Sequence, residues 1–201
     1  MPLPTQSNLV WEAGRRELGM DVGPQGRLAQ AYEGLVWMDF RREFMEERGC
    51  GVYERLAPEL AGDVYVAYRT NYREPEKAKG GGLAERCRAG ERKVLAAMAT
   101  WAAYADVARR ALLAGNREQA HQLMNENLDL RMQMVEAEEE DAALARAARA
   151  SAKLAGSGGA IVGLYEGEAM LERLRVELGK LGARVVRAET GVRTRPEEEA
   201  G

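Results

Sequence analysis

Residues 63–68, Asp-Val-Tyr-Val-Ala-Tyr, decide the fold of this chain. Their β-branched and aromatic side chains are typical of a strand. The sequence that follows predicts helices from Leu83 to about Leu154, a buried strand at 160–165, one more helix and a last strand at 184–188. This order of strand, helices, strand, helix and strand predicts an α+β sandwich, with helices on one face of a small sheet.

Hydrophobic spacing predicts where the helices of this region lie. In the first, Met98, Trp101, Ala105, Ala108 and Leu112 recur every three or four residues and predict one buried face. A second helix is expected from Arg117 to about Val135. A third is expected from the acidic run 136–141 to Lys153, and this run is interpreted as a solvated face near the helix start. In the last helix, four leucines mark one face: Leu171, Leu174, Leu178 and Leu181.

The flanking segments are more irregular. Thr70–Gly82, with Pro75 and three successive glycines, is expected to be a mobile loop. The polar tail from Thr190 is expected to be disordered. Before residue 63, the patterns predict short helices at 8–19 and 27–33, a turn-rich loop at 21–26, and strands at 35–39 and 52–56.

Composition narrows the functional classes. The 201 residues carry a net charge of −3 without a basic stripe, so nucleic-acid binding is not expected. No apolar run approaches the ~18 residues of a membrane span, and the start has no signal-peptide pattern. Cys50 and Cys87 lack metal-like spacing, which favours a reduced, cytoplasmic protein without a metal site. The one histidine, His121, is interpreted as a surface residue.

Three places could carry chemistry. Gly156-Ser157-Gly158-Gly159 could present backbone N–H groups to an anion, although such a loop is more often a tight turn. On the helix from 117, Arg131 and Asn127 fall on or beside the apolar stripe of Ala120, Met124, Leu128 and Val135. They could face a substrate cleft, or Arg131 could extend to solvent or pair with a nearby acidic residue. Gly23–Arg27 opens a helix, whose N-terminus could attract an anion.

These places resemble a known family. Residues 153–162, Lys-Leu-Ala-Gly-Ser-Gly-Gly-Ala-Ile-Val, are similar to the third GHMP-kinase motif, K-x-T-G-S-G-G-A. Residues 122–131 resemble the L-M-N-x-N-x-D-x-R helix of glucuronokinases, and residues 29–40 resemble their A-Q-x-Y-G-G-L-V-Y-M-D-F stretch. Order and spacing agree from about Asn8 to Ala188.

The resemblance implies both a fold and an activity. Residues 1–60 would be a remnant of an N-terminal α/β domain, 61–190 a helix-rich, ferredoxin-like C-terminal domain, and 191–201 a disordered tail. Family members phosphorylate the anomeric hydroxyl of glucuronate with ATP and magnesium. Gly156, Ser157, Gly158 and Gly159 would then bind the nucleotide. The sugar acid would be bound by Arg27, Tyr32, Asn127 and Arg131, since the guanidinium fork of an arginine matches a carboxylate.

Several departures from the family pattern argue against independent turnover. The chain begins after the expected second motif, P-x-x-x-G-L-G-S-S-A, which would supply the phosphate cradle. Gly26 stands where the family pattern G-L-Q-D-R has its catalytic Asp, so no catalytic residue is assigned. Residues 71–77 replace a D-S-G-K loop, and Ala155 replaces a Thr. Because phosphoryl transfer depends mainly on positioning and charge stabilisation, losing the cradle should matter most.

Three interpretations therefore stay open. The chain could be a kinase segment that works with a separate N-terminal half. It could be a non-catalytic remnant that binds a sugar acid, a nucleotide or a partner protein. It could also be a structural protein that self-associates through its helices or through strand edges around 35–56.

Overall fold

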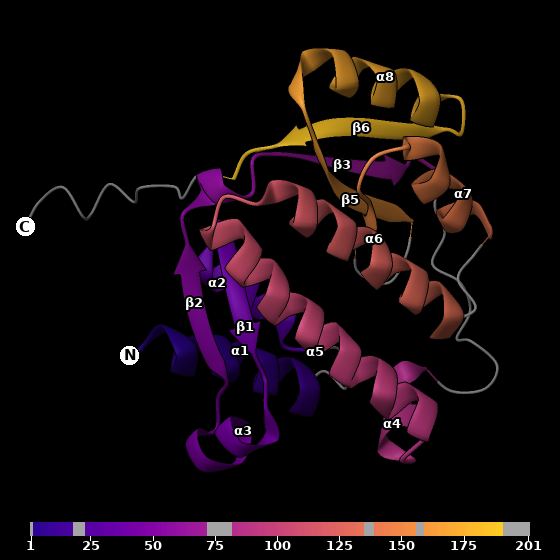
Figure 1. Cartoon of the computed structure of the whole chain (residues 1–201). Coiled ribbons are helices and arrows are strands. Elements are labelled where there is room, and N and C mark those ends of the chain that lie inside the picture. The colour runs from indigo at the N-terminus through magenta and orange to yellow at the C-terminus, as the bar shows by residue number, and fades with distance from the viewer. Residues whose placement is uncertain (1, 18–22, 72–81, 135–138, 156–158, 191–201) are drawn as a thin grey trace, which may run out of the picture. The chain divides into compact units, whose positions relative to one another are not determined.

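The computed structural model describes residues 2–17, 23–71, 82–134, 139–155 and 159–190 (Figure 1). The chain divides into two compact units: unit 1 comprises 1–59 with 190–201, and unit 2 runs from Leu60 to Glu189. Both units combine helices with antiparallel strands, so the predicted α+β class is confirmed. Within the described ranges, no helix is long and apolar enough to cross a membrane. The tail 191–201 and most of the predicted loop at 70–82 lie outside these ranges.

Unit 1 contains a two-stranded antiparallel sheet. Strands β1 (Leu35–Asp39) and β2 (Val52–Leu56) pair with Leu35 opposite Leu56, and both match the predicted strands. The other elements of the unit are α1 (Leu3–Arg16), α2 (Gln25–Tyr32) and α3 (Arg42–Arg48). Helix α1 begins five residues before the predicted start, because Pro4 lies in its first turn, where proline is tolerated. Helix α3 was not predicted.

Unit 2 is built on a four-stranded antiparallel sheet with the order β4-β5-β3-β6. Its strands are β3 (Asp63–Arg69), β4 (Lys153–Leu154), β5 (Ala160–Tyr165) and β6 (Ala183–Ala188). In the register, Tyr65 lies opposite Gly163, and Ala67 lies opposite Ile161 and Val185. Because directly paired residues point to the same side of a sheet, these side chains share one face.

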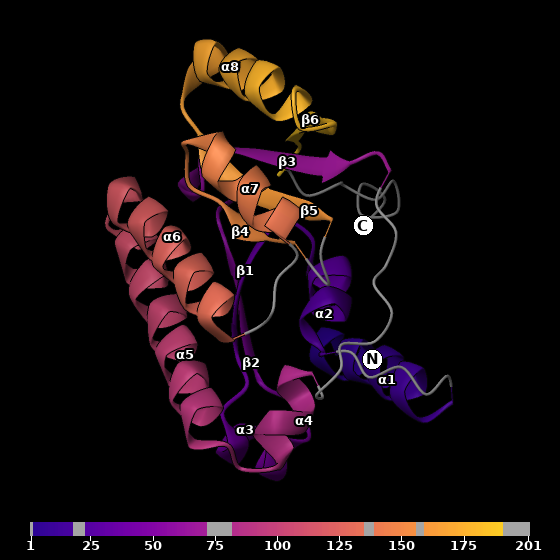
Figure 2. The same ribbon diagram turned by 90° about the vertical axis from the view of Figure 1, so that its right-hand side faces the viewer.

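Helices α7 (Glu139–Ala148) and α8 (Gly167–Gly179) pack on that face, and α8 lies along β6 (Figures 1 and 2). Three of the four predicted leucines are fully buried, but Leu181 is 45% exposed because α8 ends at Gly179. The core of unit 2 joins the sheet to both helices through Tyr65, Ala67, Leu144, Ala145, Ala148, Ala152, Leu154, Ile161, Tyr165, Leu171, Leu174, Leu178 and Ala183.

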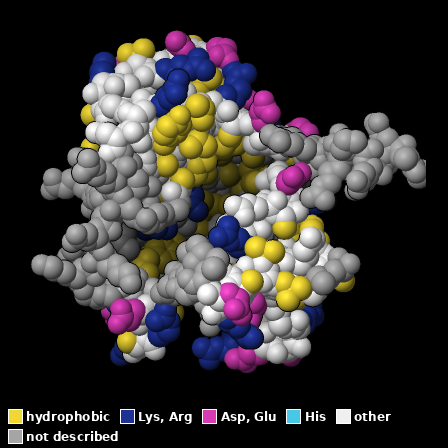
Figure 3. Space-filling view, turned by 180° about the vertical axis from the view of Figure 1, so that it is seen from behind, with side chains coloured by type: hydrophobic (Ala, Val, Ile, Leu, Met, Phe, Trp, Pro, Cys, Tyr) yellow, Lys and Arg dark blue, Asp and Glu magenta, His cyan; other side chains and the backbone are white. Residues whose placement is uncertain are grey.

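On the other face of the sheet, Val66 lies between Val162 and Val186, and Val186 is 40% exposed. Figure 3, the view from behind, shows hydrophobic side chains gathered in the upper part of the molecule, which the sheet and α8 occupy in Figure 1.

The remaining helices of unit 2 are α4 (Leu83–Arg88), α5 (Arg92–Leu113) and α6 (Arg117–Met134), and α5 and α6 run side by side (Figures 1 and 2). The predicted buried face of α5 is wrong in part. Val94, Ala97 and Ala111 are buried, whereas Met98 and Ala105 are exposed. Trp101, Ala108 and Leu112 are half-buried, so the true face partly overlaps the predicted one and is rotated by less than the roughly 100° of one residue. Alanines occur all round this helix, so spacing alone could not fix its orientation.

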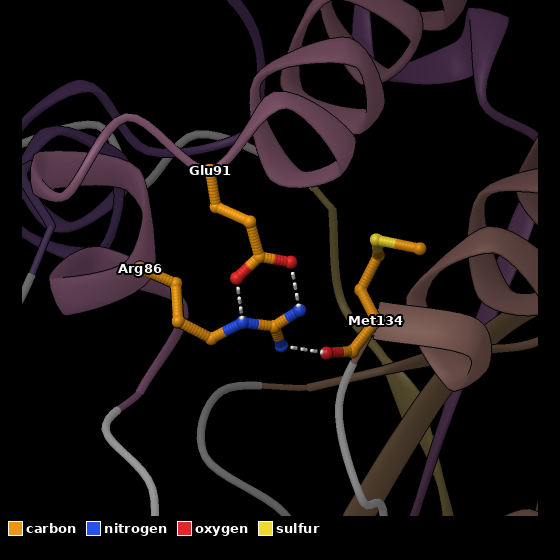
Figure 4. A network of polar contacts seen from close by, with 3 residues as sticks. All are labelled: Arg86, Glu91 and Met134. Atoms are coloured by element: carbon orange, nitrogen blue, oxygen red, sulfur yellow. Dashed lines mark hydrogen bonds and ion pairs between the residues drawn. The ribbon is translucent and has the colours of Figure 1, made fainter.

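Arginine side chains from neighbouring helices bind the carbonyl ends of α6 and α7. Arg86 of α4 donates to the carbonyl oxygen of Met134 at 2.5 Å while pairing with Glu91 through two 2.7 Å contacts (Figure 4). Arg173 of α8 donates to the carbonyl oxygens of Ala148 (3.2 Å) and Arg149 (3.4 Å). These contacts satisfy carbonyl groups that a helix end leaves without an intrahelical partner.

The third predicted helix was too long. Arg149 adopts φ 44°, in the left-handed region, so α7 ends at Ala148 instead of Lys153. Lys153 and Leu154 then pair with Val162 and Ile161 as β4. An apolar, alanine-rich sequence favours a helix, but pairing with the buried strand β5 outweighs that preference here.

Candidate functional site

Gly159, the last residue of the predicted glycine loop, is bound through both of its backbone polar groups. Its N–H lies 3.1 and 3.0 Å from the two carboxylate oxygens of Asp141, and its carbonyl oxygen accepts the Arg69 N–H at 2.9 Å. Gly159 has φ 72°, which favours glycine. Gly156, Ser157 and Gly158 lie outside the described residues, so their predicted nucleotide contacts stay a prediction.

Asp141, the last residue of the acidic run, does not lie on a solvated face, and the interpretation of residues 136–140 stays a prediction. This residue is 3% exposed, and its carboxylate lies 3.2 Å from the Arg69 guanidinium, whose side chain is 9% exposed. A buried carboxylate is tolerated only when it is paired and hydrogen-bonded, and Arg69 and Gly159 meet both conditions. Sequence gave no signal for this pair, because 72 residues separate its members and neither belongs to a recognised motif.

Helix α6 carries Asn127 and Arg131 four residues apart, so they share one helix face. Leu128 and Met132, one position further along, pack against the core, which places Asn127 and Arg131 beside the core stripe. The Asn127 carbonyl oxygen accepts the Trp101 indole N–H at 3.4 Å. Burial lowers the pKa of the Arg131 guanidinium, so this charge is partly withdrawn from water.

Lys153 brings a second positive charge to this region. The neighbouring Ala152 N–H donates to the Asn125 side-chain oxygen at 3.1 Å, which fastens the start of β4 to α6. Burial, and then the charge of Arg131, lowers the pKa of the Lys153 ammonium. Among the side chains that the structure describes, Lys153 has no ion-pair partner. The sequence interpretation placed Lys153 at the end of a helix and did not identify it as a site residue, although Lys153 is the first residue of the motif-like stretch 153–162.

The other predicted site residues lie in unit 1, on α2. Gly26 is exposed, and a Cβ added there would meet no atom within 4 Å. Arg27 is half-buried and donates to Gln30 at 3.2 Å. Tyr32 is 7% exposed, and its ring packs edge-on against Tyr53 with centroids 5.8 Å apart. Tyr32 is therefore a packing residue of unit 1, and its predicted sugar contact stays a prediction.

Two half-buried cations, Arg131 of α6 and Lys153 of β4, form an arrangement suited to an anion. Bringing like charges together away from water is costly unless an opposite charge neutralises them. A carboxylate or phosphate group of a ligand would be attracted to the Lys153 ammonium, which has no ion-pair partner among the described side chains. Across the described ranges, no cluster of three or more His, Cys, Asp or Glu side chains is placed to hold a metal ion, so no residue is assigned to magnesium.

Comparison with known proteins supports a kinase relationship. No protein-family model matches the chain. The sequence is 33% identical over 182 residues to glucuronokinase 1 of Arabidopsis thaliana, covering 87% of this chain and 50% of that protein. It is 34% identical over 188 residues to probable glucuronokinase 2 of the same plant, covering 90% and 51%. The chain thus spans about half the length of the curated relatives it matches.

Solved structures agree at the level of the fold. Mevalonate kinase of L. major, crystallised with R-mevalonate, has a TM-score of 0.64 and 21% identity, covering 90% of this chain and 56% of that one. The Lin0012 protein of Listeria innocua has a TM-score of 0.66 and 16% identity, covering 94% and 62%. The chain is thus similar in sequence to glucuronokinases over about half of their length, and its fold resembles that of mevalonate kinase.

Proposed function

We propose that the chain contributes the C-terminal part of a sugar-1-kinase that transfers a phosphoryl group from ATP to the anomeric hydroxyl of glucuronate or a related sugar acid. Two similarities support this proposal: the glucuronokinase relatives at 33–34% identity, and the motif-like stretches at 122–131 and 153–162. The proposed setting is the cytoplasm.

The observation that carries the proposal is the cation pair of Arg131 and Lys153. Arg131 comes from α6, which contains the stretch 122–131, and Lys153 comes from β4, where the stretch 153–162 begins. A sugar acid brings a carboxylate to such a site, whereas a neutral sugar does not. The planar fork of Arg131 would orient the carboxylate, and the compact ammonium of Lys153 would add a point charge. Asn127, one turn from Arg131, would contact the sugar hydroxyls.

Other parts of the reaction would come from elsewhere. The described residues offer no metal cluster, so the magnesium that accompanies ATP would be held by another part of the enzyme. Gly26 has no side chain to orient the attacking hydroxyl. A separate N-terminal half is the proposed partner for both roles, and self-association of the chain is the other way in which a complete site could form.

A thermal-shift titration with Mg-ATP, glucuronate and glucose tests the proposal. A ligand at 100 times its dissociation constant adds about 2.7 kcal/mol of stability, which such an assay resolves easily. We expect glucuronate to raise the melting temperature and glucose, which lacks the carboxylate, to have little effect. If neither glucuronate nor Mg-ATP shifts a cooperative transition, the chain has no working site of this kind.

Two variants test the cation pair. Arg131→Ala and Lys153→Met should each weaken glucuronate binding roughly 10- to 100-fold, the effect of losing a charge-assisted hydrogen bond. Lys93→Met is the matched control, since Lys93 is an exposed lysine on α5. Glucuronate affinity unchanged in both Arg131→Ala and Lys153→Met would remove this pair from the sugar-acid site.

Gly26 favours a second candidate function, a non-catalytic protein that binds a sugar acid or nucleotide. A phosphotransfer assay with Gly26→Asp separates the two functions. A side chain at this position meets open space, and an acidic residue in the first turn of α2 is compatible with the helix dipole. Turnover that appears only in Gly26→Asp, with an N-terminal half of glucuronokinase 1 supplied, would identify the natural chain as the binding protein.

A further inference from the structure

We propose that Arg86, paired with Glu91, is a positioning residue for the proposed sugar-acid site. It holds the last turn of α6, the turn that carries Arg131, and so keeps Arg131 beside Lys153. The inference rests on the proposed function, which assigns these two cations to the ligand. Neither Arg86 nor Glu91 belongs to any of the motif-like stretches.

The turn between α4 and α5 brings Arg86 and Glu91 together. Gly90 adopts φ 75°, and the Glu91 N–H donates to the Arg86 carbonyl oxygen at 3.1 Å. Two contacts of 2.7 Å then join the Arg86 guanidinium to the Glu91 carboxylate, which lies at the N-terminus of α5, where negative charge is favoured. Because backbone and side chains both fix this pair, the remaining guanidinium nitrogen is held ready to donate to a third group.

That third group is the end of α6. Arg86 Nη1 donates to the Met134 carbonyl oxygen at 2.5 Å, so the guanidinium lies between the Glu91 carboxylate and the helix end (Figure 4). Met134 is the last residue of α6 and is 4% exposed, so its carbonyl group needs a partner within the protein. The contact therefore fastens the C-terminal turn of α6 to α4 and to the start of α5.

Arg131 lies in this last turn. Two other contacts hold α6, since Trp101 binds the Asn127 carbonyl oxygen and the Asn125 side chain accepts a backbone N–H next to β4. Both of them precede Arg131 in the helix, whereas the Arg86 contact follows it. Helix ends open more readily than helix centres, so loss of Arg86 would let the turn that carries Arg131 fray.

Lys153 reports the position of the Arg131 charge. Burial lowers the pKa of the Lys153 ammonium, and the charge of Arg131 lowers it further. If Arg131 moves away with a frayed turn, this pKa should rise towards its ordinary value of 10.5. The placement of Arg131 can thus be measured without any ligand.

Three substitutions separate positioning from loss of charge and from folding. Arg86→Met removes the donor, whereas Arg86→Lys keeps the charge and one donor for the Met134 carbonyl oxygen but lacks the fork that fits Glu91. Arg92→Met is the matched control, since it removes the same charge from an exposed arginine one residue after Glu91. Each substitution is made in the natural chain and in Arg131→Ala, and circular dichroism verifies that every variant is folded.

Calorimetry with glucuronate gives the first readout. We expect Arg86→Met to weaken binding roughly 2- to 5-fold, the factor that corresponds to the ordinary contribution of a cation at a helix C-terminus. Arg86→Lys should recover part of this loss, and Arg92→Met should bind as the natural chain does. In the Arg131→Ala background, Arg86→Met should cause no further loss, because the residue through which it acts is absent. A merely structural contact would give equal losses in both backgrounds.

An NMR titration of the Lys153 side chain gives the second readout. We expect Arg131→Ala to raise its pKa, Arg86→Met to raise it by less, and Arg92→Met to leave it unchanged. The shift caused by Arg86→Met should disappear in the Arg131→Ala background. A direct effect of the Arg86 charge on Lys153 would persist there.

The two readouts separate failure of this inference from failure of the proposed function. If the natural chain binds glucuronate and Arg86→Met binds it equally well, or loses the same factor in both backgrounds, the positioning role is wrong and the proposed function survives. If the natural chain does not bind glucuronate, the proposed sugar-acid site is wrong, and the pKa of Lys153 alone decides whether Arg86 places Arg131. A Lys153 pKa that rises in Arg131→Ala but not in Arg86→Met would overturn that placement.

Discussion

Gly163 of β5 packs closely against Ser151 and Tyr65, and its replacement by alanine should strongly destabilise unit 2. A Cβ at this position would overlap the Ser151 carbonyl oxygen and would lie 2.5 and 2.7 Å from two ring carbons of Tyr65. Tyr65 cannot move easily, because it is fully buried and its hydroxyl donates to the same Ser151 carbonyl oxygen at 3.0 Å. The Ser151 hydroxyl in turn accepts the Leu164 N–H at 3.0 Å.

The magnitude follows from these contacts. Overpacking of a core typically costs about 1–3 kcal/mol. Displacing Ser151 or Tyr65 would also break their buried hydrogen bond, a further ~1–3 kcal/mol. Alanine is favoured over glycine within a strand by about 0.5–1 kcal/mol, which offsets part of this cost. We therefore expect Gly163→Ala to lower the free energy of unfolding by roughly 1–5 kcal/mol, which can be a large share of the ~5–15 kcal/mol of an ordinary domain.

Urea denaturation followed by far-UV circular dichroism measures this change. The control is Gly179→Ala at the end of α8, where an added Cβ meets nothing within 4 Å and the backbone has no positive φ. That variant should be neutral or up to about 1 kcal/mol more stable than the natural chain, because alanine restricts the unfolded state. Equal midpoints for Gly163→Ala and Gly179→Ala would refute the close packing of Ser151 and Tyr65 over β5.

Further predictions concern charged side chains of both units. Lys153→Met should be more stable than the natural chain at pH 7. Burial lowers the pKa of the Lys153 ammonium below its unfolded value of 10.5. The buried charge therefore destabilises the folded state at neutral pH, and this cost fades as pH rises towards 10.5. The melting temperatures of the two proteins should converge as pH is raised from 7 to 10.5. Arg86→Ala should speed amide exchange at the C-terminal end of α6, where the Arg86 side chain binds the Met134 carbonyl oxygen, and unchanged exchange would show that this contact is unimportant. Asp39→Asn should cost about 1–3 kcal/mol, because the Asp39 side chain is 9% exposed and its carboxylate accepts hydrogen bonds from the Arg41 backbone N–H and guanidinium; a smaller loss in chemical denaturation would contradict this contribution.

Some residues of the candidate site lie in the motif-like stretches and could be predicted from the sequence, whereas others are brought together only by folding. Arg131 and Asn127 could be found from sequence, since a polar pair beside an apolar stripe is visible from spacing on one helix. Lys153 was missed because its local sequence favours a helix, and only pairing with β5 makes it a strand residue. Asp141 and Arg69 meet through folding alone, so an acidic run looked like an ordinary solvated surface.

The sequence by itself determined the α+β class, the strands at 35–39, 52–56, 63–68 and 160–165, and the face of α8, because these depend on local alternation and helical spacing. Only the tertiary structure decided which face of α5 is buried, where α7 ends and how Asp141 reaches Gly159. An alanine-rich helix has no strong apolar face, so packing against its neighbours orients it. Asp141 and Arg69 are far apart in the chain, so no local sequence pattern predicts that they pair.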